Sequence, residues 1–391
     1  MVDAELILER LGLDVREVPH VDAQVAHLDF AARGLTARLP GTHIMRIIRR
    51  DEFDAWLARN AVNRGIEIRE SVTVKDVRPD GAGVTVETDG GLFRAQVVVG
   101  ADGSNGVTRR CILPVAPMHT ARLLEVLTPV TARSPKGDRA VSALTREIAS
   151  SWRDSAAPRN AVSHPVRAES PGPPGRNGQR AARVRGTNGD MHAADHAYLD
   201  FFPVPAGIAG YVWDFPTQVQ GEPMRCWGIY DANLRSDQGS TARDAVPLRQ
   251  PLADEMSRHG LDLAACELKG HPVRWFSPRQ RVSVPRVLLV GDAAGTDGVF
   301  GEGISIALGY GQVAAQVIHA AIESGDFSFR KYRRTLLLSP LGQSLTIRWA
   351  ITQALYRLHW AWSQKLLWRG LKPLVAWGGL HLVLNWARRT K

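Results

Sequence analysis

Apolar side chains recur with a helical period over residues 51–65, where Phe53 and Trp56 fall on one stripe. We expect Asp51 to cap the start of this helix, because a short acidic side chain accepts hydrogen bonds from the first N–H groups. Gly65 is expected to end it, because glycine tolerates the left-handed turn after a helix. The pattern therefore predicts a helix of about four turns.

The pattern changes to strands after this helix. β-branched side chains are frequent in residues 66–90, and the pairs Asp80-Gly81 and Asp89-Gly90 predict hairpin turns. Residues 95–99, AQVVV, form a continuous apolar run, which is typical of a buried parallel strand. This part of the chain therefore predicts hairpins followed by one strand of an α/β sheet.

A second set of elements lies beyond residue 196. Aromatic and β-branched runs over residues 198–217 and 223–234 favour an antiparallel sheet, and residues 248–260 have a helical pattern. Residues 286–290, RVLLV, predict a second buried strand, which breaks into a glycine turn before a helix over residues 303–323. The chain is therefore predicted to be α/β (α+β), with parallel strands in one part and an antiparallel sheet in another.

Residues 131–194, which are rich in Arg, Pro, Ser and Gly, show neither the helical nor the strand period of apolar side chains. Such a composition buries too little apolar surface to offset the entropy of ordering. We therefore expect a disordered insertion there, which would carry no functional residue.

Charge changes this picture only at the C-terminus. The net charge is +10, and residues 327–391 have twelve Lys and Arg but no Asp or Glu, so the basicity belongs to the tail. A basic tail without a basic domain argues against nucleic acid as a partner. The three cysteines form no CxxC pair and the start of the chain has no secretory pattern, so we expect a cytoplasmic protein without a metal centre.

Six of the eleven tryptophans lie in the basic tail: Trp349, Trp360, Trp362, Trp368, Trp377 and Trp386. The longest uncharged run, residues 373–387, is too short to span a bilayer. Basic helices that carry tryptophan favour an anionic membrane interface, so peripheral contact with the inner face of the membrane is one interpretation. The other is a helical cap that packs its tryptophans on the rest of the protein.

Two strand ends carry residue types that suit a cofactor. In residues 97–110, VVVGADGSNGVTRR, Asp102 and Gly103 follow the first parallel strand at its carboxyl end, where ligands bind in open α/β sheets. An Asp-Gly turn with no ligand is the alternative interpretation.

The second strand end, in residues 287–308, is VLLVGDAAGTDGVFGEGISIAL. Gly291 and Asp292 end the strand, and the carboxylate of Asp292 is well placed to accept hydrogen bonds from sugar hydroxyls. Gly301 and Gly303 then open a helix, whose free N–H groups and positive dipole end suit a phosphate or an electron-rich ring. The alternative is a glycine-rich helix start with no ligand.

These residues carry a resemblance to a known family. GADGSNGVTRR resembles the second nucleotide-contact motif of the aromatic-hydroxylase-like flavoproteins, and VGDAAGTDGVFGEGISIAL resembles their ribose and flavin motif. Residues 211–216, YVWDFP, are similar to the YxWxFP signature of the geranylgeranyl reductase family, and GDAAG followed by GEGI is also closest to that family. Three motifs in this order identify the chain as similar to the FAD-dependent geranylgeranyl reductases.

The resemblance implies a Rossmann-like FAD-binding domain, an antiparallel-sheet substrate domain and a C-terminal helical region. The residues it assigns to FAD are Arg50, Asp102, Gly103, Gly291, Asp292, Gly301, Gly303 and Ile304. It assigns Tyr211, Trp213 and Phe215 to the wall of an apolar substrate cavity. The alternatives are a surface role for the arginine and a core strand for the aromatic residues.

The predicted segments follow from the same resemblance. The first part of the FAD domain covers residues 1–125 and its second part covers residues 281–335. Between them lie the insertion, residues 126–196, and the substrate domain, residues 197–280, and the tail follows as residues 336–391. Family members begin with a strand, a GxGxxG turn, a helix and a second strand, which hold the FAD pyrophosphate and ribose. No GxGxxG occurs in the 391 residues, so we expect the gene to extend upstream by a βαβ unit of about 50 to 60 residues.

Two enzyme functions follow, each with NAD(P)H as the expected electron donor. In the first, the flavin passes hydride to double bonds of an isoprenoid-like substrate. In the second, the enzyme is a monooxygenase, and its reduced flavin hydroxylates or epoxidises an apolar substrate. A non-catalytic remnant or a membrane-associated binding protein is the hypothesis from another class. No His or carboxylate stands in a motif that requires a catalytic acid or base, so no catalytic residue is predicted.

Overall fold

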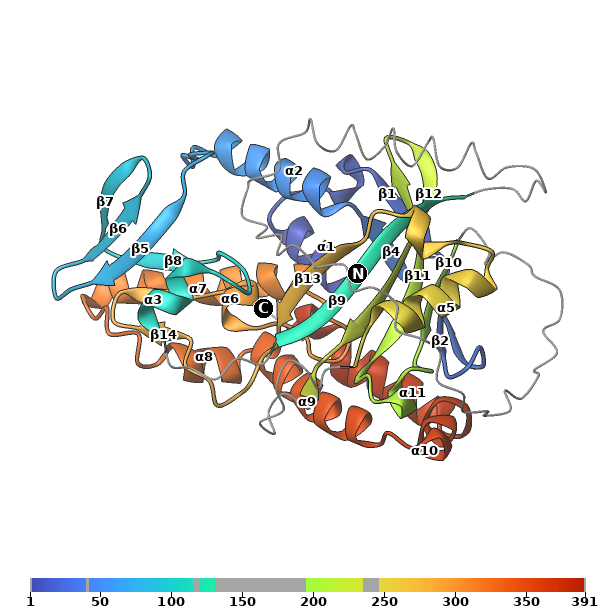
Figure 1. Ribbon diagram of the computed structural model, residues 1–391. Helices are drawn as coiled ribbons and strands as arrows, with labels where there is room; N and C mark the ends of the chain where they lie inside the picture. Colours follow the sequence, from blue (N-terminus) through green and yellow to red (C-terminus); the bar gives the residue numbers. More distant parts are fainter. Residues whose placement is uncertain (1, 40–41, 115–119, 131–194, 235–245, 390–391) are drawn as a thin grey trace, which may run out of the picture.

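The computed structural model describes residues 2–39, 42–114, 120–130, 195–234 and 246–389 (Figure 1). The predicted disordered stretch, residues 131–194, lies outside the described residues. The chain on either side of it forms β9 (Thr120–Pro129) and β10 (His196–Asp200), which belong to one sheet.

A seven-stranded sheet occupies one side of the molecule, in the order β13-β9-β12-β11-β10-β2-β3 (Figure 1). Its other strands are β2 (Val25–Asp29), β3 (Gly34–Arg38), β11 (Gly210–Val219), β12 (Glu222–Asp231) and β13 (Lys269–Arg274). All neighbouring pairs are antiparallel except β10 and β2. The antiparallel sheet predicted for the second half of the chain is confirmed, and β2, β3 and β9 join it from the first 130 residues.

Each face of this sheet has its own apolar core. On one face, α5 (Arg249–Arg258) buries Leu252 and Met256 against Trp227 and Ile229, as the helical pattern over residues 248–260 predicts. The other face is aromatic and packs against the C-terminal half of the chain, with Phe201, Tyr211, Trp213, Tyr230, Trp275, Tyr356 and Trp368 in one cluster. This aromatic face is the side on which the candidate site lies.

A three-stranded sheet has the order β14-β15-β8, from β14 (Ser283–Val284), β15 (Val287–Leu289) and β8 (Val98–Gly100). The pairing of β15 with β8 is parallel, as predicted. β15 is fully buried, but Val99 on β8 is 42% exposed, so the predicted burial of this run is wrong. The reason is that β8 has a strand neighbour on one edge only among the described residues.

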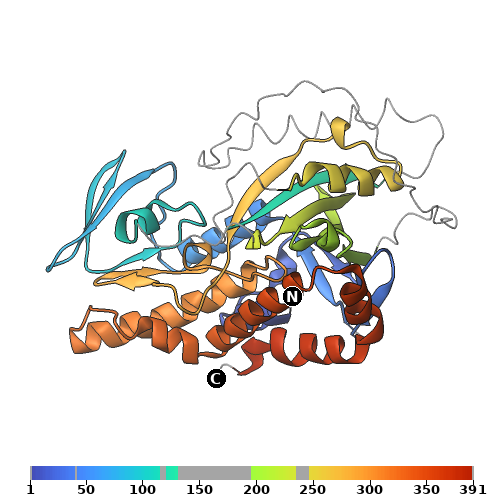
Figure 2. The ribbon, with the colours of Figure 1, turned by 60° about the horizontal axis from the view of Figure 1, so that its bottom comes forward.

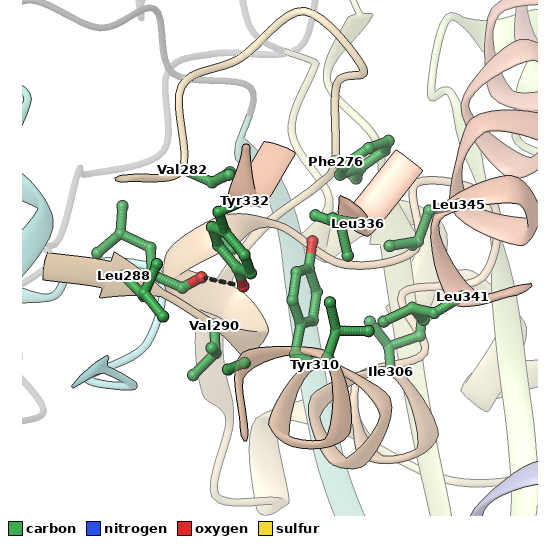
Figure 3. Packing of buried hydrophobic residues seen from close by; sticks show 14 of the residues in the cluster. Phe276, Val282, Leu288, Val290, Ile306, Tyr310, Tyr332, Leu336, Leu341 and Leu345 are labelled. Atoms are coloured by element: carbon green, nitrogen blue, oxygen red, sulfur yellow. Dashed lines mark hydrogen bonds between the residues drawn. The ribbon is translucent and has the colours of Figure 1, made fainter. Parts of the chain in front are cut away.

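The long helix α7 (Ile304–Ser324) confirms the predicted helix after the glycine turn. It is long and apolar enough to cross a membrane, yet Ile306 and Tyr310 lie in the core with β15, α8 (Tyr332–Leu338) and α9 (Pro340–Arg357). Figure 3 shows this packing and the hydrogen bond that the Tyr332 hydroxyl donates to the carbonyl oxygen of Leu289, at 3.0 Å. We therefore treat α7 as a core helix.

The predicted first helix is α2 (Arg50–Asn63). Its end is a Schellman turn, in which Gly65, at φ +84°, donates to Val62, and Ile66 donates to Ala61. The predicted cap at Asp51 is wrong, because the helix begins one residue earlier and Arg49 takes the cap position without a capping side-chain bond. Asp51 instead accepts a hydrogen bond from the Arg49 side chain.

The two predicted hairpins are confirmed by β5 (Val74–Pro79), β6 (Val84–Thr88) and β7 (Gly91–Ala95), which pair in antiparallel order. Residues 66–70 form no strand; they connect α2 to the hairpins, and Ile66 and Ile68 are exposed, so no sheet covers them. The remaining short elements are η1 (Val15–Glu17), β1 (His20–Ala23), β4 (Met45–Ile48), α3 (Val107–Ile112), η2 (Val204–Ala206), η5 (Leu263–Ala265) and α6 (Gly291–Ala294).

The C-terminal elements lie together along one edge of the molecule (Figures 1 and 2). They are α10 (Ala361–Lys365), the π-helical turn η6 (Leu366–Gly370), α11 (Lys372–Gly378), the π-helical turn η7 (Gly379–Val383) and η8 (Trp386–Arg389). The chain end returns to α1 (Val2–Arg10), where buried Asp3 accepts backbone hydrogen bonds from Asn385 and Ala387. Burial raises the pKa of Asp3.

Trp386 gives the first testable prediction. Its side chain is 2% exposed and packs over Gly309 of α7, whereas Trp377 in the same tail is 54% exposed. Trp386→Ala should lower the free energy of unfolding by about 3–5 kcal/mol, because it opens a cavity in the core. Trp377→Ala, the matched control, should change it by less than about 0.5 kcal/mol. Urea unfolding followed by circular dichroism measures both, and equal effects would contradict the packing.

Candidate cofactor site

The two predicted strand-end turns lie side by side in the structure. β8 and β15 are parallel neighbours, and Gly100 pairs with Leu289, so their carboxyl ends meet at one edge of the sheet. Ser104 links the turns: its Oγ accepts the backbone N–H of Arg274 at 2.8 Å, and its side chain is hydrogen-bonded to the Asp292 carboxyl group. Ser104 was not among the residues predicted from the sequence, although it stands next to the predicted Gly103.

Asp292 is the half-buried carboxylate of this site. Burial raises its pKa, and the positive charge of Arg50 together with the bond to Ser104 acts in the opposite direction. Arg50 is mostly exposed and pairs with Asp54 at 3.1 Å. The structure thus brings Arg50 within electrostatic range of Asp292, from a helix more than two hundred residues away in the sequence.

The start of α7 faces the same carboxylate. A Cβ added to Gly303 would lie 3.5 Å from Oδ1 of Asp292, at van der Waals distance, so the backbone at the start of α7 comes close to this carboxylate. Among the described residues, no side chain caps this helix start. The free N–H groups at the N-terminus of this 21-residue helix favour a negatively charged ligand. Gly291 and Gly301 have φ of +54° and +68°, in the left-handed region that glycine tolerates.

A cavity of about 110 Å³ opens beside this helix start. Its lining is mainly apolar, with Leu8, Ile48 and Phe53 beside Gly303 and Ile304, and it also includes the charged residues Glu5, Arg46 and Glu302. Its volume is below the roughly 300–1,000 Å³ of sites that hold a drug-sized ligand. The cavity therefore has room for part of a dinucleotide and not for all of it.

Asp102 has a local role in the structure. Its Oδ2 accepts the backbone N–H of Thr108 at 2.7 Å, which caps the start of α3. Gly106 is required there, because a Cβ would overlap the Asp102 carboxyl group at 2.2 Å. Gly103 has φ +78°, which fits the tight turn after β8. The contact of Asp102 and Gly103 with a nucleotide stays a prediction.

The predicted aromatic wall lies along one face of β11. The ring centroids of Tyr211 and Trp213 are 6.1 Å apart, and those of Trp213 and Phe215 are 6.2 Å apart. Tyr211 and Trp213 are buried in the aromatic core, and Phe215 is partly buried. Tyr211 also reaches Phe300, which precedes Gly301, so the row begins beside the turn that leads into α7.

Residues 295–303, here called the glycine loop, are held by tyrosine hydroxyls from four different elements. The pairs of hydroxyl and carbonyl are Tyr310 to Gly295 at 2.9 Å, Tyr230 to Gly298 at 3.1 Å, Tyr356 to Val299 at 2.6 Å and Tyr211 to Phe300 at 2.6 Å. Burial raises the pKa of all four tyrosines, so the hydroxyls keep their protons and donate. Tyr211 is therefore a positioning residue for the loop as well as part of the aromatic row.

A buried ion pair between α9 and the glycine loop also holds this loop in place. Nη1 of Arg348, on α9, lies 2.7 Å from Oδ2 of Asp297 and 2.9 Å from Oε2 of Glu302. Oδ1 and Oδ2 of Asp297 accept the backbone N–H groups of Val299 and Phe300, and Glu302 accepts the Ser305 hydroxyl. Burial raises the pKa of Asp297, and the two carboxylates raise the pKa of Arg348 against the effect of its own burial.

Comparison with known proteins places this arrangement in a class. The solved structure of a geranylgeranyl bacteriochlorophyll reductase-like protein from Thermoplasma acidophilum superposes with a TM-score of 0.67 and 18% identity, over 98% of this chain and 86% of the other. The halogenase PltM, in complex with phloroglucinol and FAD, superposes with a TM-score of 0.53 and 12% identity, over 95% of this chain and 75% of the other. The chain thus has the Rossmann-like fold of FAD-dependent reductases and halogenases, with its antiparallel sheet, and the predicted fold class is confirmed.

Parts of the chain are also similar in sequence to known proteins. An uncharacterised protein of Methanosarcina barkeri is 25% identical over 75% of this chain and 58% of its own length. A digeranylgeranylglycerophospholipid reductase of Thermoplasma acidophilum is 32% identical over 36% of this chain, which spans 35% of that relative. No protein-family model matches the sequence. About a third of the chain is thus similar in sequence to digeranylgeranylglycerophospholipid reductases, in agreement with the resemblance that its motifs carry.

The buried ion pair gives the second prediction. Arg348→Met should lower the free energy of unfolding by about 3–5 kcal/mol, because it leaves Asp297 and Glu302 buried without their cation. The folded-state pKa of Asp297 would then lie still further above its unfolded value. Stability is therefore present at low pH and lost as the pH rises through the folded pKa, so the variant should be weaker at about pH 8 than at about pH 5.

A rescue variant separates charge from packing. Arg348→Met with Asp297→Asn and Glu302→Gln removes the buried charges together, so it should recover more than half of the lost stability and show no fall in stability from about pH 5 to about pH 8. Urea unfolding at both pH values measures the set. A triple variant as unstable as Arg348→Met would contradict the electrostatic account.

Proposed function

We propose that this chain contributes an FAD site at the ends of β8 and β15, and that it serves an oxidoreductase which reduces double bonds of an apolar, isoprenoid-like substrate. The observation that carries the proposal is the uncapped start of α7, which lies next to the half-buried carboxylate of Asp292. Arg50 and Ser104 complete this polar edge. The surroundings fit a ligand with both sugar hydroxyls and negative charge.

The residues present have separate roles in such a site. Bound FAD would supply hydride transfer between an electron donor and the substrate, and NAD(P)H is the donor we propose. Asp292 would accept a sugar hydroxyl, and the first N–H groups of α7 would bind negative charge. The glycine loop would present its backbone to the cofactor in a fixed geometry, because side chains hold it from four sides. The sequence has no GxGxxG turn, so these contacts concern the second half of the FAD site.

The aromatic row supports an apolar substrate. Tyr211 and Phe300 are in contact, and Phe300 directly precedes Gly301, so the row adjoins the cofactor edge of the site. The name of the Thermoplasma acidophilum relative, a digeranylgeranylglycerophospholipid reductase, supports the same class of substrate. Rings that flank an apolar chain exclude water from it, which favours a reaction at an uncharged double bond.

A monooxygenase is the second candidate function. The specific observation in its favour is the fold shared with flavin-dependent halogenases, of which PltM has been solved with FAD. The two candidates differ in whether oxygen is consumed. Turnover of a polyprenyl substrate with reduced flavin under nitrogen would support the reductase, and turnover that requires oxygen would support the monooxygenase.

FAD binding itself gives the third prediction. The purified chain should bind FAD with saturable quenching of flavin fluorescence. Gly303→Val should weaken the affinity by at least about tenfold, equal to about 1.4 kcal/mol, because the new side chain enters the space before Asp292. Gly311→Val lies on the same helix with open space around its Cβ, so it is the matched control and should leave the affinity unchanged.

Two results would overturn the proposed cofactor site. One is a chain that folds but does not bind FAD at all, which would favour a non-catalytic role for it. The other is a chain in which Gly303→Val and Gly311→Val bind FAD equally well, which would place any FAD elsewhere. Thermal unfolding of both variants shows whether each is folded before it is titrated.

A further inference from the structure

The tail tryptophans divide into two sets in the structure. Trp368 and Trp386 are buried, and Trp349 is partly buried, so these pack as a helical cap does. Trp360, Trp362 and Trp377 are 50%, 64% and 54% exposed. Both interpretations of the tail therefore apply, each to a different group of residues.

The exposed tryptophans stand among exposed leucines on α10, η6, α11 and the residues beside them. This surface, here called the tail face, consists of Leu358, Trp360, Trp362, Leu366, Leu371, Leu374 and Trp377, all between 38% and 64% exposed. Trp362 and Leu366 are one helical turn apart, and Leu371, Leu374 and Trp377 follow at intervals of three. Each helical segment thus presents an apolar stripe to the outside.

The opposite side of these segments is anchored in the protein. Within the tail, the Gln364 amide donates to the carbonyl oxygen of Leu358 at 2.7 Å, and the Trp368 indole donates to Gln364 Oε1 at 3.0 Å, which fixes the position of Trp368. Trp368 stacks on Phe201 with 4.2 Å between ring centroids. The tail face is therefore a fixed surface with a buried foundation.

The C-terminal segment that carries the tail face also carries exposed positive charge. Arg357, Lys365, Arg388 and Arg389 are exposed, and residues 327–391 contain no Asp or Glu. Arg369 and Lys372 are partly buried and lie near Asp29 of β2, so their charge is shared with that carboxylate, whose pKa rises to about 6 on burial. The charge available to a partner comes from the four exposed cations, and it favours an anionic surface.

We propose that the tail face docks on an anionic lipid bilayer, with Trp360, Trp362 and Trp377 at the level of the headgroups. Tryptophan is enriched at that level because its ring is apolar and its N–H is polar. The leucines would enter the boundary of the acyl chains, and the cations would lie among the lipid phosphates. No segment of the tail needs to cross the membrane for this contact.

The docked orientation would also place the aromatic row near the bilayer. Phe201 contacts Trp368 on one side and Tyr211 on the other, at 4.2 Å and 5.3 Å between ring centroids. A lipid substrate bound along the aromatic row would thus lie on the side of the protein that faces the bilayer. This last step rests on the proposed function, whereas docking itself does not depend on a flavin.

Vesicle sedimentation without added FAD tests the docking. The chain should sediment with vesicles of equal parts phosphatidylcholine and phosphatidylglycerol, with a blue shift of its tryptophan emission, and much less with pure phosphatidylcholine. The variant W360S/W362S/W377S should lose at least about tenfold in affinity, because it removes exposed apolar area from the contact. The control V62S/L92S/I322S changes three side chains that are 52%, 70% and 60% exposed outside the tail, and it should bind as the unchanged chain does.

Three results would overturn the proposal. The unchanged chain could fail to sediment with anionic vesicles, or the tryptophan variant could bind as well as the control. The third result is a chain that does not bind vesicles and forms a dimer by light scattering, with only the tryptophan variant monomeric. A second copy of the chain would then be the occupant of the tail face. Because FAD is absent from all samples, failure here is distinct from failure of the flavin titration.

Discussion

The ion pair of Arg348 with Asp297 and Glu302 is the constraint on which the rest of the site depends. A loop with glycine at four of its nine positions has more conformational entropy to lose than an ordinary loop, so its geometry needs several fixed partners. Arg348, on α9, is one such fixed partner, because it binds the Asp297 carboxylate. Asp297 in turn accepts hydrogen bonds from two backbone N–H groups of the loop. The same guanidinium donates to the carbonyl oxygen of Val383 in the tail, so loop and tail share one anchor.

This arrangement explains why the C-terminal elements matter for the candidate cofactor site. The four tyrosine hydroxyls fix the loop carbonyls, and the ion pair fixes its acidic side chains, which leaves the N–H groups at the start of α7 facing Asp292. A binding site assembled in this way loses little entropy when its ligand arrives. The tail thus has two sides, one that builds the site and one that remains exposed for a partner.

Local patterns predicted the elements well because their causes are local. The stripe of Phe53 and Trp56 determines α2, and Gly65 determines its Schellman end. The Asp-Gly pairs determine the β5–β7 hairpins. The predicted cap at Asp51 was wrong because the helix begins at Arg50, so Arg49 takes the cap position. The second strand-end motif also located Asp292 and Gly303, and the family resemblance assigned Arg50, whose charge acts on Asp292 in the structure.

The remaining features depend on contacts between distant residues. Arg348 looked like one of twelve tail cations, because its carboxylate partners lie 46 and 51 residues earlier in the chain. The tail tryptophans looked alike, since only packing against Gly309 and Phe201 separates the buried ones from the exposed ones. Likewise, Tyr211 was predicted as part of a substrate wall, and its bond to the glycine loop has no sequence signature.

The central claim is that the glycine loop is already in its final geometry before any cofactor binds. Hydrogen–deuterium exchange of the chain without FAD tests it most directly, because Val299 and Phe300 donate their backbone N–H groups to buried Asp297. The account predicts that these two amides exchange as slowly as those of the buried core of α7. Fast exchange that becomes slow only after FAD is added would contradict it.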